Sequence, residues 1–144
     1  MDSFSHKYGE STFYFVLVTK CRYKMFGKRE HKYLFRDILL QIAERHRIAI
    51  RSLAIGDDHT HIIATIHPTM SPSKAFQLLK GASSWALFRA IPNFRRRYPR
   101  GHLWGKNGTF RSIGEVDYYT VADYVERQNQ MNLTEFIAQE FPTF

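Results

Sequence analysis

The sequence switches several times between strand-like and helix-like hydrophobic spacing, and the order of these switches limits the folds that it can form. Four segments are rich in β-branched and aromatic residues, which predicts strands: 11–20, 48–55, 59–67 and 109–115. Four other segments predict helices: 30–46, 71–91, 117–129 and 134–140. The chain therefore reads strand, helix, strand, strand, helix, strand, helix, with a short helix at its end.

The turn between the second and third predicted strands sets the fold class. Gly56-Asp57-Asp58 is short and typical of a tight turn, so we expect the two strands to pair as an antiparallel hairpin. The element order then predicts an α+β fold with helices packed on an antiparallel sheet. This is the ferredoxin-like or RRM-like βαββαβ arrangement with an added helix near the C-terminus. A length of 144 residues suits one domain spanning 1–144.

The charge of the chain predicts a polyanionic partner. The formal net charge is +8 and the sequence pI is about 9.8, which favours nucleic acid, although a basic but otherwise ordinary soluble protein stays open. No apolar run approaches the ~20 residues that cross a bilayer, so we expect no membrane association. Cys21 is the only cysteine and no signal-like segment opens the sequence, so we expect a reducing, cytoplasmic setting.

Two histidines in the third predicted strand could share a metal ion. His59 and His61 lie two residues apart, so they point to the same face of a strand and both imidazoles could reach one cation. The pair alone is a weak signal, and a purely structural role stays open. Asp57 and Asp58 directly precede the pair, where a carboxylate could orient an imidazole. Turn formation is an equally good explanation for both aspartates.

A tyrosine and a glutamine share one face of the last long predicted helix. Tyr124 and Gln128 lie four residues apart, and Val121 lies on the same face. A phenol with a pKa near 10 is a weak nucleophile, but a metal that polarises a phosphate would make it effective. The Gln128 carbonyl could supply a third ligand beside two histidines, a mixed set that suits Mg²⁺ or Mn²⁺ better than zinc. A packed tyrosine beside an exposed glutamine is the alternative.

An ordered set of short segments connects these residues to a known family. The sequence resembles the single-tyrosine HUH transposases of simple insertion sequences and their repeat-associated relatives. The order and spacing agree from about Phe13 to Gln130, and the matching segments are 15–23, 58–63, 79–84, 103–105 and 124–128. One position departs from the family, because Thr60 stands where a bulky apolar residue is usual. Threonine suits a strand, so we expect a small change in packing and no loss of metal binding.

The resemblance implies a mechanism and a set of roles. His59 and His61 would bind the metal, Gln128 would complete the set, and Tyr124 would be the nucleophile. In such enzymes the tyrosine attacks single-stranded DNA, forms a 5′-phosphotyrosine link and frees a 3′-hydroxyl, and rejoining reverses the step with another strand. The resemblance also implies recognition of DNA hairpins at element ends. It further implies a homodimer, in which the tyrosine helix of one subunit often completes the site of the other.

Two basic clusters with nearby aromatic side chains are the candidate DNA surface. Expected phosphate contacts are Lys20, Arg22, Lys24, Arg95, Arg96, Arg97 and Arg100. Expected stacking partners for unpaired bases are Tyr23, Tyr98 and Trp104. A solvated surface is the alternative for each cluster. At the level of the whole chain, the alternatives are a non-catalytic single-stranded nucleic-acid-binding domain, a metal hydrolase that uses water, and a related replication or relaxation nuclease.

Overall fold

The computed structural model describes residues 11–131 and 135–136, the side chains of 115–118, 128–131 and 135–136 excepted. The strands are β1 (Thr12–Val18), β2 (Ala49–Ile55), β3 (His59–Thr65), β4 (Thr109–Ser112) and β5 (Glu135–Phe136). The α-helices are α2 (Arg29–Arg45), α3 (Pro72–Ala90) and α4 (Glu115–Met131). Two short 3₁₀ helices are η2 (Lys20–Arg22) and η3 (Pro92–Arg96).

The five strands form one sheet in the order β4-β1-β3-β2-β5, and every neighbouring pair is antiparallel. The predicted α+β class and the βαββαβ order are therefore confirmed. The predicted hairpin is also present, since β2 pairs with β3 and the backbone N–H of Gly56 donates to the carbonyl of His59 at 2.7 Å. One register shift between Ile50 and Ser52 is an irregularity in β2, a feature that increases the local twist of a strand.

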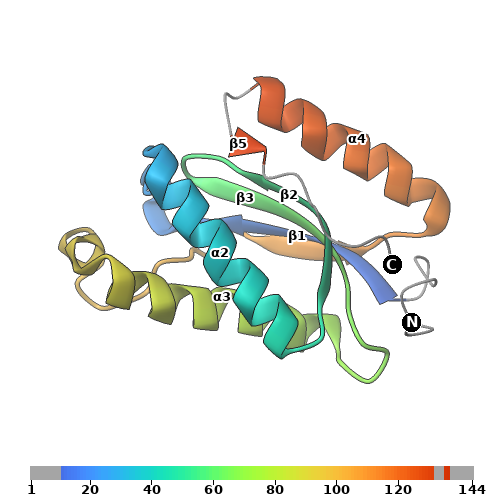
Figure 1. The fold of residues 1–144 in the computed structure, drawn as a ribbon, viewed down its shortest axis with the longest axis horizontal. Coiled ribbons are helices and arrows are strands. Elements are labelled where there is room, and N and C mark those ends of the chain that lie inside the picture. The colour runs from blue at the N-terminus through green and yellow to red at the C-terminus, as the bar shows by residue number, and fades with distance from the viewer. Residues whose placement is uncertain (1–10, 132–134, 137–144) are drawn as a thin grey trace.

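Helices cover both faces of the sheet (Figure 1). Helices α2 and α3 lie on one face over the larger core, whereas α4 packs on the other face over a smaller one. The alternation of β3 explains this division, because Ile62 and Ala64 belong to the larger core and Ile63 belongs to the smaller. The two histidines share the parity of Ile63 and therefore lie on the α4 side.

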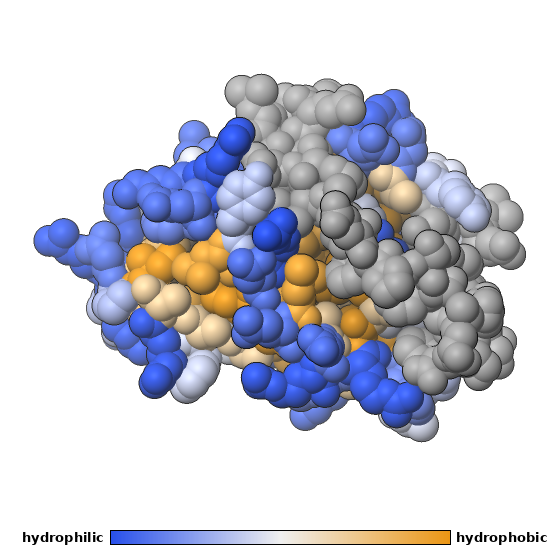
Figure 2. All heavy atoms as spheres, in the orientation of Figure 1, coloured by the Kyte–Doolittle hydropathy of each residue, from blue (hydrophilic) through white to orange (hydrophobic). Residues whose placement is uncertain are grey.

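The sequence gives direct reasons for the helix positions. Helix α3 begins after Ser71, whose side chain accepts a hydrogen bond from the Lys74 backbone N–H at 3.1 Å, and Pro72 occupies the first turn. Helix α2 buries Phe35, Leu39 and Ile42 at helical spacing. Figure 2 shows a band of hydrophobic residues between hydrophilic surfaces. No helix in the described part of the chain is long and apolar enough to cross a membrane.

The predicted helix over 134–140 is wrong where the structure describes it. Glu135 and Phe136 form β5, paired with Ile55 and Ala54 at the outer edge of β2, and 134 and 137–140 lie outside the described residues. Without β5, the edge of β2 would expose unpaired backbone groups that another segment can pair with. Local helical spacing gives no information about such a distant pairing. Helix α4 also begins at Glu115, two residues before the predicted start.

Candidate catalytic site and nucleic-acid surface

The two histidines lie side by side at the beginning of β3. Their ring centroids are 5.0 Å apart and the rings are nearly perpendicular, at 80°. The side chain of His59 is 18% exposed, whereas His61 is 7% exposed and lies deeper between the sheet and α4. The predicted common face is therefore present, with one imidazole near the solvent and the other almost buried.

The outer imidazole is held by a carboxylate. His59 Nδ1 lies 2.7 Å from Asp58 Oδ1, and Arg22 Nε donates to Asp58 Oδ2 at 3.1 Å. Burial raises the pKa of the Asp58 carboxyl, but the hydrogen bonds from His59 and Arg22 outweigh burial and lower this pKa below its usual value. A charged carboxylate only accepts, so Nδ1 of His59 carries the proton. In a neutral imidazole with this tautomer, the lone pair lies on Nε2 and can bind a metal ion.

The inner imidazole is held by a tyrosine from the neighbouring strand. Tyr14 Oη lies 2.6 Å from His61 Nδ1, and the two rings stack with centroids 5.7 Å apart. Burial, and secondly the neighbouring His59, lower the pKa of His61 to about 4, so this imidazole is neutral at neutral pH. If His61 Nδ1–H donates to the phenol oxygen, Nε2 of His61 keeps its lone pair and can also bind a metal.

Tyr14 itself stays protonated. Burial and the nearby Tyr124 raise the pKa of Tyr14 to about 12, against a lowering by Arg111. Nothing in the sequence singled out Tyr14, because it lies 47 positions from His61 and in a different strand. The contact depends on the register, in which Val16 is opposite His61 and Tyr14 is opposite Ile63. Only strand pairing could have revealed it.

Helix α4 brings Tyr124 to the same place. Val121 and Val125 are 5% and 0% exposed and pack in the smaller core with Ala54 and Ile63 of the sheet. Between these anchors, Tyr124 is 44% exposed. Its ring centroid lies 6.1 Å from that of His61, at an interplanar angle of 90°. The phenol is therefore open to a ligand while its ring lies against His61.

The remaining predicted metal ligand, Gln128, lies in α4 one turn after Tyr124. Its side chain lies outside the described residues. Among the side chains that are described, no group of three or more His, Cys, Asp or Glu residues is arranged to hold a metal. His59 and His61 thus offer two imidazole nitrogens, and among the described side chains no third His, Cys, Asp or Glu joins them. An amide, water or phosphate oxygen could complete the coordination of a shared cation.

Of the two roles predicted for Asp57, the structure shows the one in the turn. Its carboxylate pairs with Lys32 Nζ at 2.8 Å, and its backbone carbonyl accepts from Phe26 N–H at 2.9 Å. The expectation that Asp57 orients a histidine is therefore not met. Lys32 is 5% exposed and also donates to the Phe26 carbonyl. A buried ammonium needs such partners, so Asp57 fixes the β2–β3 turn against α2.

The fold brings the two predicted basic clusters together at the end of the sheet that carries His59. The predicted cations there are exposed: Lys20, Arg22, Lys24, Arg95, Arg96, Arg97 and Arg100. Lys24 from the first cluster and Arg96 and Arg97 from the second line one open hollow of about 640 Å³. Figure 2 shows hydrophilic side chains covering this end of the molecule. Arg22 additionally binds Asp58, so it belongs both to the surface and to the support of His59.

The predicted stacking residues differ in how far they are accessible. Tyr98 is 4% exposed and donates its hydroxyl proton to the carbonyl of Lys20 at 2.7 Å, so the prediction that it stacks on a base is wrong for this structure. The pKa of Tyr98 is raised to about 12, mainly by burial. Trp104 is half-buried against Phe26, and its indole N–H donates to Ser83 Oγ at 3.0 Å. Tyr23 is 37% exposed.

Comparison with known proteins agrees with this arrangement. A family model described as "Transposase IS200 like" matches residues 7–128. The ISDra2 transposase TnpA of Deinococcus radiodurans is 26% identical over 94 residues, covering 65% of this chain and 67% of that protein. The transposase for insertion sequence element IS200 of Salmonella typhimurium is 25% identical over 126 residues, covering 88% of this chain and 82% of that protein.

Solved structures share the fold. A Deinococcus radiodurans protein named as a candidate transposase superposes with a TM-score of 0.66 at 24% identity, over 81% of this chain and 89% of that chain. A REP-associated tyrosine transposase bound to a REP hairpin superposes with a TM-score of 0.63 at 14% identity, over 87% of this chain and 70% of that chain. Because the family model spans most of the sequence, the chain belongs to the IS200-like transposases, the single-tyrosine HUH type that its motifs resemble.

Proposed function

We propose that this transposase cleaves and rejoins single-stranded DNA with Tyr124 as the nucleophile. The observation that carries the proposal is the meeting of three side chains from distant parts of one chain, His59 and His61 from β3 and Tyr124 from α4. The exposed phenol can reach a DNA strand, and the surrounding basic surface can hold the phosphates of that strand.

The residues around the histidine pair have separate roles in this proposal. A divalent metal, Mg²⁺ or Mn²⁺, held by His59 and His61 with Gln128 as a third ligand, would polarise the scissile phosphate and stabilise the charge that develops on it. Asp58 and Tyr14 hold the two imidazoles so that one nitrogen of each points away from its own hydrogen bond. This orientation is fixed before DNA arrives, which avoids a reorganisation cost during the reaction.

The covalent step exchanges one ester for another. The Tyr124 oxygen attacks phosphorus, the bond from phosphorus to the 3′ oxygen breaks, and the free 3′ end takes up a proton. The phenol proton leaves to solvent, to which Tyr124 is open. The product is a 5′-phosphotyrosine that keeps the energy of the broken ester. A 3′-hydroxyl from another strand can therefore rejoin the DNA without a nucleotide cofactor.

The DNA partner in this proposal includes a hairpin. One solved relative in fold is described as bound to a REP hairpin, and the exposed cations around η2 and η3 form a surface suited to a DNA backbone. We further propose that the protein acts as a homodimer. Gel filtration with light scattering tests the dimer separately from the chemistry.

Trapping the covalent intermediate tests the proposal. The protein is incubated with Mn²⁺ and a single strand labelled at its 3′ end, then denatured and resolved on a gel. The expected result is a labelled protein band with the wild type and none with Tyr124→Phe. Tyr119→Phe is the matched control, because Tyr119 is an exposed tyrosine of the same helix, at 63%, and this variant should still form the band.

The other outcomes separate the alternatives. Nicked DNA without a protein band would indicate a hydrolase that uses water. Binding without either product, at saturating Mn²⁺ and with several strands, would indicate a non-catalytic nucleic-acid-binding domain. Loss of the band in His59→Ala, with DNA affinity retained, is expected because binding is spread over many cations.

A further inference from the structure

An arginine that belongs to neither basic cluster lies on the same side of the sheet as the histidines. Arg111 is the third residue of β4, the strand at one edge of the sheet. Phe110 packs against the larger core and its ring lies 6.0 Å from that of Phe15. Because successive side chains of a strand point to opposite faces, Arg111 is directed to the side of the smaller core. This is the side of α4 and the histidines.

Strand pairing places Arg111 beside Tyr14. The two residues are opposite each other in the antiparallel pair of β1 and β4. Arg111 Cζ lies 5.8 Å from the centroid of the Tyr14 ring, within the range of a cation–π interaction. Strand β1 pairs with β3 on its other side, where the Tyr14 ring stacks with His61 at 5.7 Å. Tyr14 therefore lies between the guanidinium and the inner histidine.

The guanidinium of Arg111 has donors to offer to a ligand. The side chain is exposed, and contact with a ring leaves the N–H groups of a planar guanidinium available to an acceptor. Among the described side chains, no carboxylate pairs with Arg111, whereas Arg22 binds Asp58 and Arg127 binds Asp123. An exposed arginine of this kind suits the oxygens of a phosphate.

The charge of Arg111 also acts on the proposed reaction centre. Burial raises the pKa of Tyr14 most, Tyr124 raises it further, and Arg111 lowers it. Tyr124 from α4 and Arg111 from β4 therefore both lie close to the same phenol. The Tyr14 ring separates Arg111 from His61, so the guanidinium does not share the place of a metal-bound phosphate. A neighbouring phosphate of the same strand fits its position.

The positions along β1 define a path for that strand. The basic end of the sheet lies at Val18, which pairs with His59. Tyr14 and its partner Arg111 lie four residues away from Val18, roughly 13 Å along the strand. The histidines and Tyr124 lie between these two places. A DNA strand that starts on the basic end and crosses the histidines can therefore reach Arg111.

We propose that Arg111 binds the backbone phosphate next to the one that Tyr124 attacks, and so directs the DNA strand along the α4 side of the sheet toward β4. This inference rests on the proposed function, because it gives the path of the strand in that reaction. The neighbouring phosphate keeps its charge throughout the reaction. The contact should therefore stabilise the bound substrate and the transition state equally.

The first experiment measures the phosphate contact without cleavage. Binding of a fluorescent single strand of mixed sequence is followed by anisotropy without metal, over a range of salt concentrations. Arg111→Gln should lower the slope of log affinity against log salt by about 0.7, as the loss of one contact to a single strand does. Arg111→Lys keeps the charge and should keep the slope. Both variants should unfold at the wild-type temperature, because the side chain is exposed.

Arg36→Gln is the matched control for the loss of charge. Arg36 also lies over a tyrosine ring, that of Tyr33, at 5.1 Å. It belongs to α2, which covers the opposite face of the sheet (Figure 1). This variant should keep the wild-type slope, because the proposed path does not pass over α2.

The second experiment follows the rate of adduct formation with Mn²⁺ as the concentration of the strand increases. Arg111→Gln should need about tenfold more DNA for the half-maximal rate, as the loss of one charged hydrogen bond implies. It should keep the maximal rate, because the contact is the same in substrate and transition state. A strand with an uncharged methylphosphonate beside the attacked phosphate, on one of its two sides, should impair the wild type by the same factor and Arg111→Gln no further.

Each outcome supports or overturns the contact. Equal salt slopes for the wild type and Arg111→Gln would overturn it. A lower maximal rate in a stably folded Arg111→Gln would overturn the assignment to a neighbouring phosphate, and so would full sensitivity of this variant to both methylphosphonates. The binding experiment involves no cleavage, so it judges Arg111 separately from Tyr124. A lowered slope together with no adduct from the wild type would reject the nucleophile and keep the phosphate contact.

Discussion

Each of the two histidines is held by one partner side chain, and these two partners determine what the site can do. Asp58 fixes His59 through Nδ1, and Tyr14 does the same for His61. Such partners set the tautomer and the ring orientation of a metal-binding histidine. The adjacency of Asp58 to His59 could be read from the sequence, since they are neighbours. Tyr14 could not, because its contact with His61 exists only after β1 and β3 pair.

Removing the Tyr14 hydroxyl should weaken metal binding. Tyr14→Phe keeps the stacked ring and deletes the partner of His61 Nδ1, so we expect the dissociation constant for Mn²⁺ to rise about 10–100-fold, measured by calorimetry. Tyr98→Phe is the matched control, since it removes a similarly bonded hydroxyl at a buried tyrosine away from the histidines. Equal Mn²⁺ affinities for wild type and Tyr14→Phe would show that the hydroxyl has no positioning role.

Thr60, the one departure from the family motif, should limit stability. Its side chain is fully buried on the larger core, and among the described residues its hydroxyl has no hydrogen-bond partner. Thr60→Val keeps the shape and removes this unpaired group, so the free energy of unfolding should rise by about 1 kcal/mol. The Thr65 hydroxyl is hydrogen-bonded to Thr12 and Arg51. The control variant Thr65→Val should therefore have a lower free energy of unfolding than the wild type. Urea titrations of both variants measure the two effects.

At the scale of elements, the sheet and its helices were predicted well where a short-range signal exists. The alternation in β3 placed His59 and His61 on one face, and Ser71 marked the start of α3. Two predictions failed because the deciding partner is distant in sequence. Glu135–Phe136 pairs with the edge of β2, and Tyr98 enters the core to bond the Lys20 carbonyl.

Helix α4 is the element whose docking positions Tyr124. Val125 is fully buried one residue after the tyrosine, so Val125→Ala should cost about 1–3 kcal/mol of stability. Because the smaller core holds α4 to the sheet, the loss should appear as faster hydrogen exchange in α4 and as less covalent adduct. Uniformly faster exchange in α2 and α4 alike would instead indicate a purely global destabilisation.

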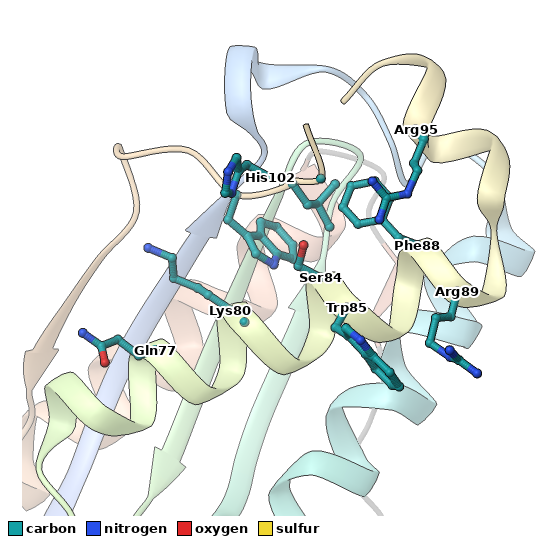
Figure 3. Close-up of a pocket in the computed structure, with 12 residues that line it drawn as sticks. Gln77, Lys80, Ser84, Trp85, Phe88, Arg89, Arg95 and His102 are labelled. Atoms are coloured by element: carbon teal, nitrogen blue, oxygen red, sulfur yellow. The ribbon is translucent and has the colours of Figure 1, made fainter. Parts of the chain in front are cut away.

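At the scale of the molecule, the sheet separates two different surfaces. The histidines and Tyr124 lie on the side of the smaller core, and a hollow between α3 and the segment 101–104 lies on the side of the larger one (Figure 3). Both lie near the end of β1, where the exposed cations of η2 and η3 gather. The net charge of +8 predicted a polyanionic partner, but only the fold shows that two clusters separated in sequence form one basic end.

The described arrangement also predicts how subunits cooperate. Tyr124 and His61 of the same chain are in contact, so each subunit should contain its own complete site. A mixture of His59→Ala and Tyr124→Phe proteins, allowed to exchange subunits, should therefore form no adduct. Adduct formation by the mixture would mean that α4 of one subunit serves the histidines of the other. Wild type mixed with either variant controls for inhibition.

The most direct test of the account is to identify the residue that becomes attached to DNA. The trapped adduct is digested with protease and nuclease, and the peptides are sequenced by mass spectrometry. The account predicts a single 5′-phosphotyrosine at Tyr124, formed only when divalent metal is present. Attachment at another residue, including the neighbouring Tyr14, or efficient cleavage with no attached residue, would contradict it.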